Sequence, residues 1–228
     1  MERKILFAWD FHGTLEKGNE RAVQELCNLV LKDFGINREL SLKEVLDWYG
    51  LSWFDYFKNA FLAGSPELWQ NMVNKVFSYQ KTGWELIKKY ISAQDFAEDV
   101  LKKIKERGHQ NIILTNSKQD HAEKFIETLG FAKYFDKIAG VDGYLNAHKN
   151  LSTEEKKQNA KADALKEFLL GSNFTKIIMI GDNESDIRAG KMVGAKTYLF
   201  AAPGKNKKTE ATGADHIIFD LREVLKEL

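Results

Sequence analysis

Two acidic clusters follow short apolar runs, one near each end of the chain. The first run, residues 5–9, ends at Asp10, and the second, residues 177–180, leads into Asp182 and then Asp186. Short apolar runs bounded by turn signals are typical of buried strands, so each cluster is expected at the carboxyl end of a strand. Two strand-end acidic clusters suggest one magnesium-dependent site for phosphoryl transfer.

The first cluster has the residue types that a covalent phosphoryl-transfer mechanism needs. Asp10 can act as a carboxylate nucleophile that forms an aspartyl-phosphate, which splits one hard hydrolysis into two easier steps. Gly13 lets the backbone turn sharply so that amides face a phosphate, and Thr14 follows it directly. Taken alone, Asp10 could equally begin a turn, and it is the cluster at Asp182 that favours the catalytic interpretation.

The second cluster supplies candidate metal ligands. Mg²⁺ usually takes one or two carboxylates together with water and substrate phosphate, and Asp10 and Asp182 can supply those carboxylates. Asp186 lies four residues after Asp182, so it is placed to orient the metal ligands without binding the metal itself. Asn183 and Glu184 lie in the same loop and are alternatives for the roles of both Asp182 and Asp186.

Strands and helices alternate over most of the chain. Strands are predicted at residues 4–9, 111–114, 137–139, 177–180, 196–200 and 216–219, and helices at residues 95–107, 120–129, 159–170, 185–193 and 222–228. This rhythm predicts a parallel sheet covered on both faces, with ligands bound beyond the carboxyl ends of its strands. Polar residues at those ends include Thr115 and, in a following loop, Asp142.

Residues 16–90 interrupt this rhythm. Helices are predicted over residues 20–34, from the capping box that begins at Ser41, and from Pro66, and no convincing strand is found. The stretch is therefore interpreted as an inserted domain. Four of the five tryptophans lie in it, and we expect them to form its core.

Composition limits the classes of partner. The 228 residues include 34 basic and 33 acidic side chains, for a formal net charge of +1, which does not favour nucleic-acid binding. The single cysteine, Cys27, lies on an apolar helical face, so we expect a buried thiol and no intramolecular disulfide. The apolar run before Asp10 is too short for a signal peptide or a membrane span. We expect a cytoplasmic monomer or homodimer.

These residues together resemble the haloacid dehalogenase superfamily, whose phosphatases share a first motif of aspartate-x-aspartate-glycine-threonine. The run Asp10-Phe11-His12-Gly13-Thr14 is similar, with His12 in place of the second aspartate. Thr115 matches the second motif, Lys161 the third, and the run from Gly181 and Asp182 to Asp186 the fourth. Lys149, Lys156 and Lys157 are alternatives for the lysine. The resemblance covers about two thirds of the chain.

The resemblance implies an α/β fold, with a Rossmann-like, doubly wound parallel sheet as the core and an inserted α-helical cap. The core would comprise residues 1–15 and 91–228, and the cap residues 16–90. It also implies a Mg²⁺-dependent phosphatase that acts on a small phosphorylated substrate. Thr115 and Asn116 would bind the phosphate together with Gly13 and Thr14, and Lys161 would balance the negative charge. Glu16 and Lys17, which leave the first motif directly, are candidates for contacting the substrate.

His12 is the departure from the family pattern. In related phosphatases the backbone carbonyl at this position ligates Mg²⁺, and the side chain protonates the leaving group and then activates water. A histidine keeps the carbonyl, and its imidazole can still serve as acid and then base. Alternatively, His12 suppresses water activation, which would leave a slow phosphotransferase or a ligand-binding protein. Halide displacement is less favoured, because it does not need the metal cluster that Asp182 and Asp186 build.

Overall fold

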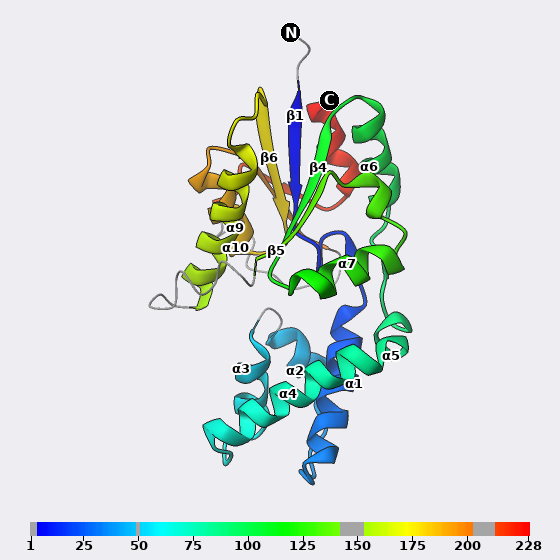
Figure 1. The fold of residues 1–228 in the computed structure, drawn as a ribbon, viewed down its shortest axis with the longest axis vertical. Helices are drawn as coiled ribbons and strands as arrows, with labels where there is room; N and C mark the ends of the chain where they lie inside the picture. Colours follow the sequence, from blue (N-terminus) through cyan, green and yellow to red (C-terminus); the bar gives the residue numbers. More distant parts are fainter. Residues whose placement is uncertain (1–3, 49–50, 142–152, 203–212) are drawn as a thin grey trace. The chain divides into compact units, whose positions relative to one another are not determined.

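A computed structural model describes residues 4–48, 51–141, 153–202 and 213–228 (Figure 1). The chain divides into two compact units. The sheet unit comprises Met1–Glu16 and Ala93–Leu228, and the helical unit comprises Lys17–Ser92.

The sheet unit is built on six strands in the order β5-β4-β1-β6-β7-β8, and every neighbouring pair is parallel. β1 lies inside the sheet and is buried along its whole length, which explains its continuous apolar sequence. The predicted α/β fold with a Rossmann-like parallel core is therefore confirmed. The strands are β1 (Ile5–Trp9), β4 (Gln110–Thr115), β5 (Lys137–Gly140), β6 (Lys176–Gly181), β7 (Lys196–Phe200) and β8 (His216–Ile218).

Helices cover both faces of this sheet, and Figure 1 shows α9 and α10 on one side and α6 on the other. Successive side chains of a strand point to opposite faces, so Leu6 and Ala8 pack with Ala164 and Leu165 of α9 in one buried cluster. The helices are α6 (Ala97–Glu106), α7 (Gln119–Thr128), α9 (Thr153–Leu169) and α10 (Glu184–Met192), with the 3₁₀ helices η1 (Ala132–Tyr134) and η3 (Leu221–Glu227).

Two predicted helices differ from the structure. α9 begins at Thr153 and not at residue 159, because its first turns are polar and charged and show no apolar periodicity. The closing helix at the carboxyl end is a 3₁₀ helix and not an α-helix. Asp142 and Lys149, which the sequence singled out, lie outside the described residues.

The helical unit packs around its own apolar core. Cys27 is fully buried in this core, and burial raises the pKa of its thiol to about 12. Trp69 belongs to the same cluster, and Trp48 and Trp53 pack against it, as expected, whereas Trp84 is not part of this cluster. The predicted capping box at Ser41 and the proline at the start of α4 are both confirmed. The helices are α1 (Asn19–Asp33), α2 (Leu42–Asp47), α3 (Trp53–Ala60), α4 (Pro66–Thr82) and α5 (Trp84–Lys88).

The prediction that residues 16–90 contain no strand is wrong at its first two positions. β2 (Glu16–Lys17) pairs with β3 (Ser92–Ala93) as a two-stranded sheet. Strands of two residues are too short for apolar alternation to appear in the sequence. No helix in the described part of the chain is long and apolar enough to cross a membrane.

Candidate active site

The topology brings three polar strand ends to one edge of the sheet. Asp10 directly follows β1, Thr115 is the last residue of β4, and Asp182 directly follows β6. β1 pairs with both β4 and β6, and all three run in the same direction. Their carboxyl ends therefore lie side by side, at the edge where parallel sheets of this class bind ligands.

An acidic cluster stands at this edge. Oxygen atoms of Asp10, Asp182 and Asp186 lie within 4.8 Å of one another, and all three side chains are buried. The ammonium of Lys161 joins two of them, with Nζ donating to Asp10 Oδ1 at 2.7 Å and to Asp186 Oδ1 at 2.5 Å. Among the candidate lysines, the structure places Lys161 in the cluster. The side chain of Lys157, like Lys149, lies outside the described residues.

The charged groups of this cluster shift one another's pKa values. Burial alone would lower the pKa of Lys161, but the carboxylates of Asp10 and Asp186 outweigh it and raise that pKa above its usual range. Burial and the charge of Asp10 raise the pKa of Asp186. Three buried carboxylates facing one ammonium leave an excess of negative charge that a divalent cation would neutralise. A donor set made of oxygen fits Mg²⁺ and related hard cations.

Asp186 owes its position to the start of α10. Asn183 is the N-cap of this helix and Asp186 its third residue, which together form a capping box. The Oδ2 atom of Asp186 accepts hydrogen bonds from the backbone N–H groups of Asp182 at 3.2 Å and Asn183 at 3.1 Å. Gly181 makes room for this side chain, because a Cβ there would lie 2.3 Å from the Cβ of Asp186.

A tight turn follows Asp10. The carbonyl of Phe11 accepts hydrogen bonds from the backbone N–H groups of Thr14, Leu15 and Glu16 at 2.9–3.2 Å. Gly13 occupies the left-handed region of the turn, with φ of 82°, where a side chain would be strained. The hydroxyl of Thr14 donates to Asp10 Oδ2 at 3.3 Å, so it helps to hold the carboxylate in place.

His12 is partly buried, with 19% of its side chain exposed, and both of its ring nitrogens contact protein groups. Its Nδ1 lies 2.9 Å from Glu16 Oε2, and its Nε2 lies 3.1 Å from Ser117 Oγ. The rings of Phe11 and Phe125 meet the imidazole edge-on, at centroid distances of 5.0 and 4.6 Å. The interpretation of Glu16 as a substrate contact is wrong, because its side chain is fully buried and pairs with His12. Spacing alone does not reveal this pair, since it depends on how the turn closes.

The loop after β4 carries the remaining candidates. The hydroxyl of Thr115 accepts a hydrogen bond from the N–H of Ser117 at 3.3 Å, and Thr115 itself is buried. The Oδ1 atom of Asn116 is buried and has no hydrogen-bond partner among the described residues. A buried polar atom of this kind is one that a bound ligand or water would satisfy. Sequence reasoning missed Ser117, although it stands only two residues beyond Thr115.

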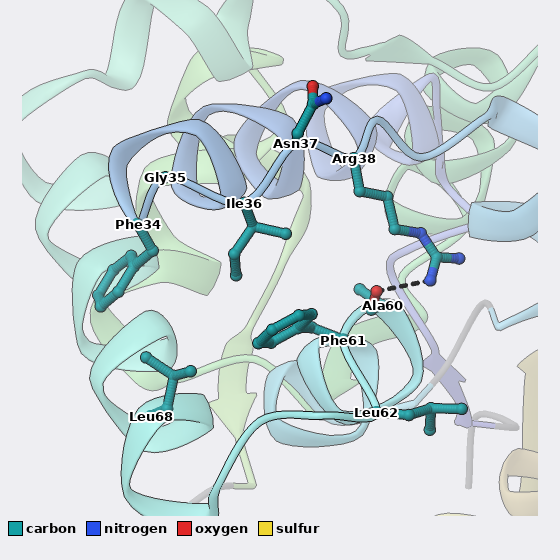
Figure 2. Close-up of a pocket in the computed structure, with 9 residues that line it drawn as sticks. All are labelled: Phe34, Gly35, Ile36, Asn37, Arg38, Ala60, Phe61, Leu62 and Leu68. Atoms are coloured by element: carbon teal, nitrogen blue, oxygen red, sulfur yellow. Dashed lines mark hydrogen bonds between the residues drawn. The ribbon is translucent and has the colours of Figure 1, made fainter.

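A separate hollow lies in the helical unit (Figure 2). It is lined mainly by apolar side chains, and its one charged residue, Arg38, is already engaged. The Arg38 guanidinium donates to the carbonyl of Ala60 at 2.5 Å and to Glu44 Oε1 at 2.7 Å. The hollow therefore lacks convergent polar groups for chemistry. Its lining residues are Phe34, Gly35, Ile36, Asn37, Arg38, Ala60, Phe61, Leu62 and Leu68.

Comparison with known proteins agrees with this geometry. The sequence profile of the haloacid dehalogenase-like hydrolases matches residues 5–200. The chain belongs to this family. Pyrophosphatase PpaX of Halalkalibacterium halodurans is 27% identical over 195 residues, which cover 86% of this chain and 81% of that protein. A phosphoglycolate phosphatase of Aquifex aeolicus is 30% identical over 100 residues, or 43% of this chain and 42% of its own.

Solved structures show the same fold. A haloacid dehalogenase-like hydrolase from Streptococcus pneumoniae aligns over 99% of this chain and 98% of its own, with a TM-score of 0.76 and 19% identity.

Proposed function

We propose that this protein is a Mg²⁺-dependent phosphatase that hydrolyses a small phosphorylated metabolite through an aspartyl-phosphate on Asp10. Family and relatives make the chain a hydrolase of phosphate esters. The observation that supports the finer proposal is the buried cluster in which Lys161 bridges Asp10 and Asp186 beside Asp182. In this arrangement the Asp10 carboxylate is positioned for attack on phosphorus. The excess negative charge of the cluster would be neutralised by a divalent cation.

The reaction assigns a role to each group. Asp10 attacks phosphorus, the bond from phosphorus to the leaving oxygen breaks, and His12 gives that oxygen a proton. A water molecule then attacks the phosphorus of phospho-Asp10 and gives a proton to His12. The bond from phosphorus to the Asp10 oxygen breaks, so inorganic phosphate is released and the Asp10 carboxylate is restored. Thr115 and Asn116 bind the phosphate oxygens, with Gly13 and Thr14 in the turn beneath.

The charged residues around Asp10 support these steps. Lys161 pairs with Asp10 and offsets the charge of the phosphoryl group. Asp10, Asp182 and the backbone carbonyl of His12 would hold Mg²⁺, with Asp186 behind them. When bound, the metal would neutralise phosphate charge and align the phosphoryl group.

The helical unit, Lys17–Ser92, is proposed to be a cap. It is inserted directly after the first motif, and caps in this position exclude water and select substrates. This proposal assigns substrate choice to the helical unit and chemistry to the sheet unit.

The second candidate is a slow phosphotransferase or a weakly active, ligand-binding protein. It is favoured by one observation, that both ring nitrogens of His12 face protein groups, Glu16 and Ser117. In this alternative the imidazole would not reach a water molecule, and phospho-Asp10 would persist.

A panel of phosphate esters, including p-nitrophenyl phosphate, pyrophosphate and phosphoglycolate, tests both candidates. Each is assayed with Mg²⁺ and with a chelator, and acid-quenched samples are analysed for protein-bound phosphate. A phosphatase shows sustained, metal-dependent turnover that Asp10→Asn abolishes. Stoichiometric protein phosphorylation without further turnover would favour the slow phosphotransferase. If no ester is turned over and none phosphorylates the protein, both forms of the enzyme are rejected.

A further inference from the structure

Glu16 is a buried acid whose position is specified by the backbone. Its side chain has no exposed surface, and a buried carboxylate is costly unless it is paired. The turn returns residue 16 to the side of residue 12, where the two form an isolated bridge, and the N–H of Gly13 donates to the Glu16 carbonyl at 3.1 Å. This backbone arrangement brings Oε2 of Glu16 to 2.9 Å from Nδ1 of His12.

This contact determines how the imidazole is presented. A carboxylate can only accept hydrogen bonds, so Nδ1 of His12 carries the hydrogen that lies between it and Glu16. In the neutral ring Nε2 is then an acceptor, and it faces the hydroxyl of Ser117 at 3.1 Å. The T-shaped contacts with Phe11 and Phe125 further restrict how the ring can turn. Orientation and tautomer are thereby both set by protein groups.

We propose that Glu16 is a positioning residue for His12, and that the pair together replaces the carboxyl group that the family pattern has at position 12. This inference rests on the proposed function, in which His12 transfers the proton. A carboxylic acid at position 12 has no ring to orient. A second carboxylate beside the buried Glu16 would also be repelled. Glu16 should therefore help a histidine at position 12 and hinder an aspartate there.

Four proteins test whether the effect of Glu16 changes sign with the residue at position 12: wild type, Glu16→Gln, His12→Asp and the double variant. The substitution at Glu16 keeps the side-chain volume and removes the charge. Each protein is assayed for kcat/KM with phenyl phosphate, whose leaving group needs a proton, and with p-nitrophenyl phosphate, whose leaving group needs little. We expect Glu16→Gln to lower kcat/KM for phenyl phosphate by about 10-fold or more when His12 is present, with a smaller loss for p-nitrophenyl phosphate. In the His12→Asp background the same substitution should raise kcat/KM.

Glu227→Gln is the matched control for removing a buried acid. Glu227 is also buried in the sheet unit, but it accepts hydrogen bonds from Lys176 and Lys196, at the amino ends of β6 and β7. This variant should change thermal stability without changing the ratio of kcat/KM between the two substrates.

The outcomes separate the inference from the function on which it rests. Equal losses from Glu16→Gln in the wild-type and His12→Asp backgrounds would mean that Glu16 only stabilises the fold, and the inference would be rejected. His12→Ala is assayed beside these proteins as a test of the proton-transfer role itself. A loss in His12→Ala with no loss in Glu16→Gln would reject the positioning role alone. An unchanged His12→Ala would reject the proton-transfer role of His12 itself, and the inference with it.

Discussion

Gly181→Ala tests whether the close packing beneath Asp186 matters for chemistry. An added Cβ would lie 2.3 Å from the Cβ of Asp186 and 2.4 Å from its Cγ and Oδ2, whereas ordinary contacts begin at 3.4 Å. The Asp186 side chain must therefore move by about 1 Å, or the strand end must move by the same amount. Movement of the side-chain end alone cannot absorb the change, because the clash also involves the Cβ and Cγ atoms of Asp186.

The structure allows the consequences of that movement to be estimated. A shift of about 1 Å would stretch the 2.5 Å bond between Lys161 and Asp186 to the limit of a hydrogen bond. It would also weaken the bonds from the backbone N–H groups of Asp182 and Asn183. Losing one hydrogen bond to a charged group costs roughly 1.5–3 kcal/mol. Misplacement of a catalytic group by 1 Å can cost about 10²-fold in rate. We expect Gly181→Ala to lower kcat by roughly that factor.

Gly190→Ala is the matched control. Its Cβ would lie 2.7 Å from Met179 and 2.8 Å from Thr197, so it also overpacks the space between α10 and the sheet, but it meets none of the site carboxylates. Urea unfolding should show a loss of about 1–3 kcal/mol for each variant. Phosphatase activity per folded molecule, measured against Mg²⁺ concentration, should fall for Gly181→Ala only. Equal activity losses in the two variants would refute the argument that Asp186 must stay where it is.

Three further outcomes are expected. Asp10→Asn should keep the fold, as judged by circular dichroism, and lower turnover of an aryl phosphate by at least ~10³-fold, because the nucleophile is lost. Asp182→Ala should raise the Mg²⁺ concentration needed for half-maximal activity, and a chelator should abolish wild-type activity; activity that survives chelation would contradict the metal site. Burial opposes ionisation of Glu227, but hydrogen bonds from Lys176, Lys196 and Tyr198 outweigh it and lower its pKa to about 2. The stability that this provides is present above the unfolded pKa and is lost as pH falls from about 4.5 towards 2, so acid unfolding of Glu227→Gln should depend less steeply on pH there.

The sheet could be predicted from sequence because its strands are buried. Burial on both faces leaves the continuous apolar runs of β1 and β6, and the alternation of strands with helices specifies that the sheet is parallel. The start of α9 was not predictable in the same way, because its first turns bury no apolar stripe. The two-residue strands β2 and β3 are held by pairing between distant segments, which leaves no local pattern.

The site residues also divide into those that a local sequence pattern predicts and those that depend on how the chain folds. Asp10 and Asp182 follow strands directly, so predicting the strands also predicts that both residues lie at the carboxyl ends of the sheet. Glu16 was assigned to the wrong role because its environment depends on the hydrogen bonds that close the turn on Phe11. Ser117 carries no signal of its own, because a serine in a loop is common and its contact with His12 joins residues far apart in sequence.

The spacing of the second acidic cluster has a structural cause that ties folding to chemistry. The third residue of a helix can reach back to the N–H groups of the turn before it, and Asp186 does so with one carboxylate oxygen. Its other oxygen then points to Lys161, which in turn binds the candidate nucleophile Asp10. The separation of four residues between Asp182 and Asp186 is thus the spacing at which one side chain both starts α10 and orients the charges of the site. A chain that forms this helix has already placed that carboxylate.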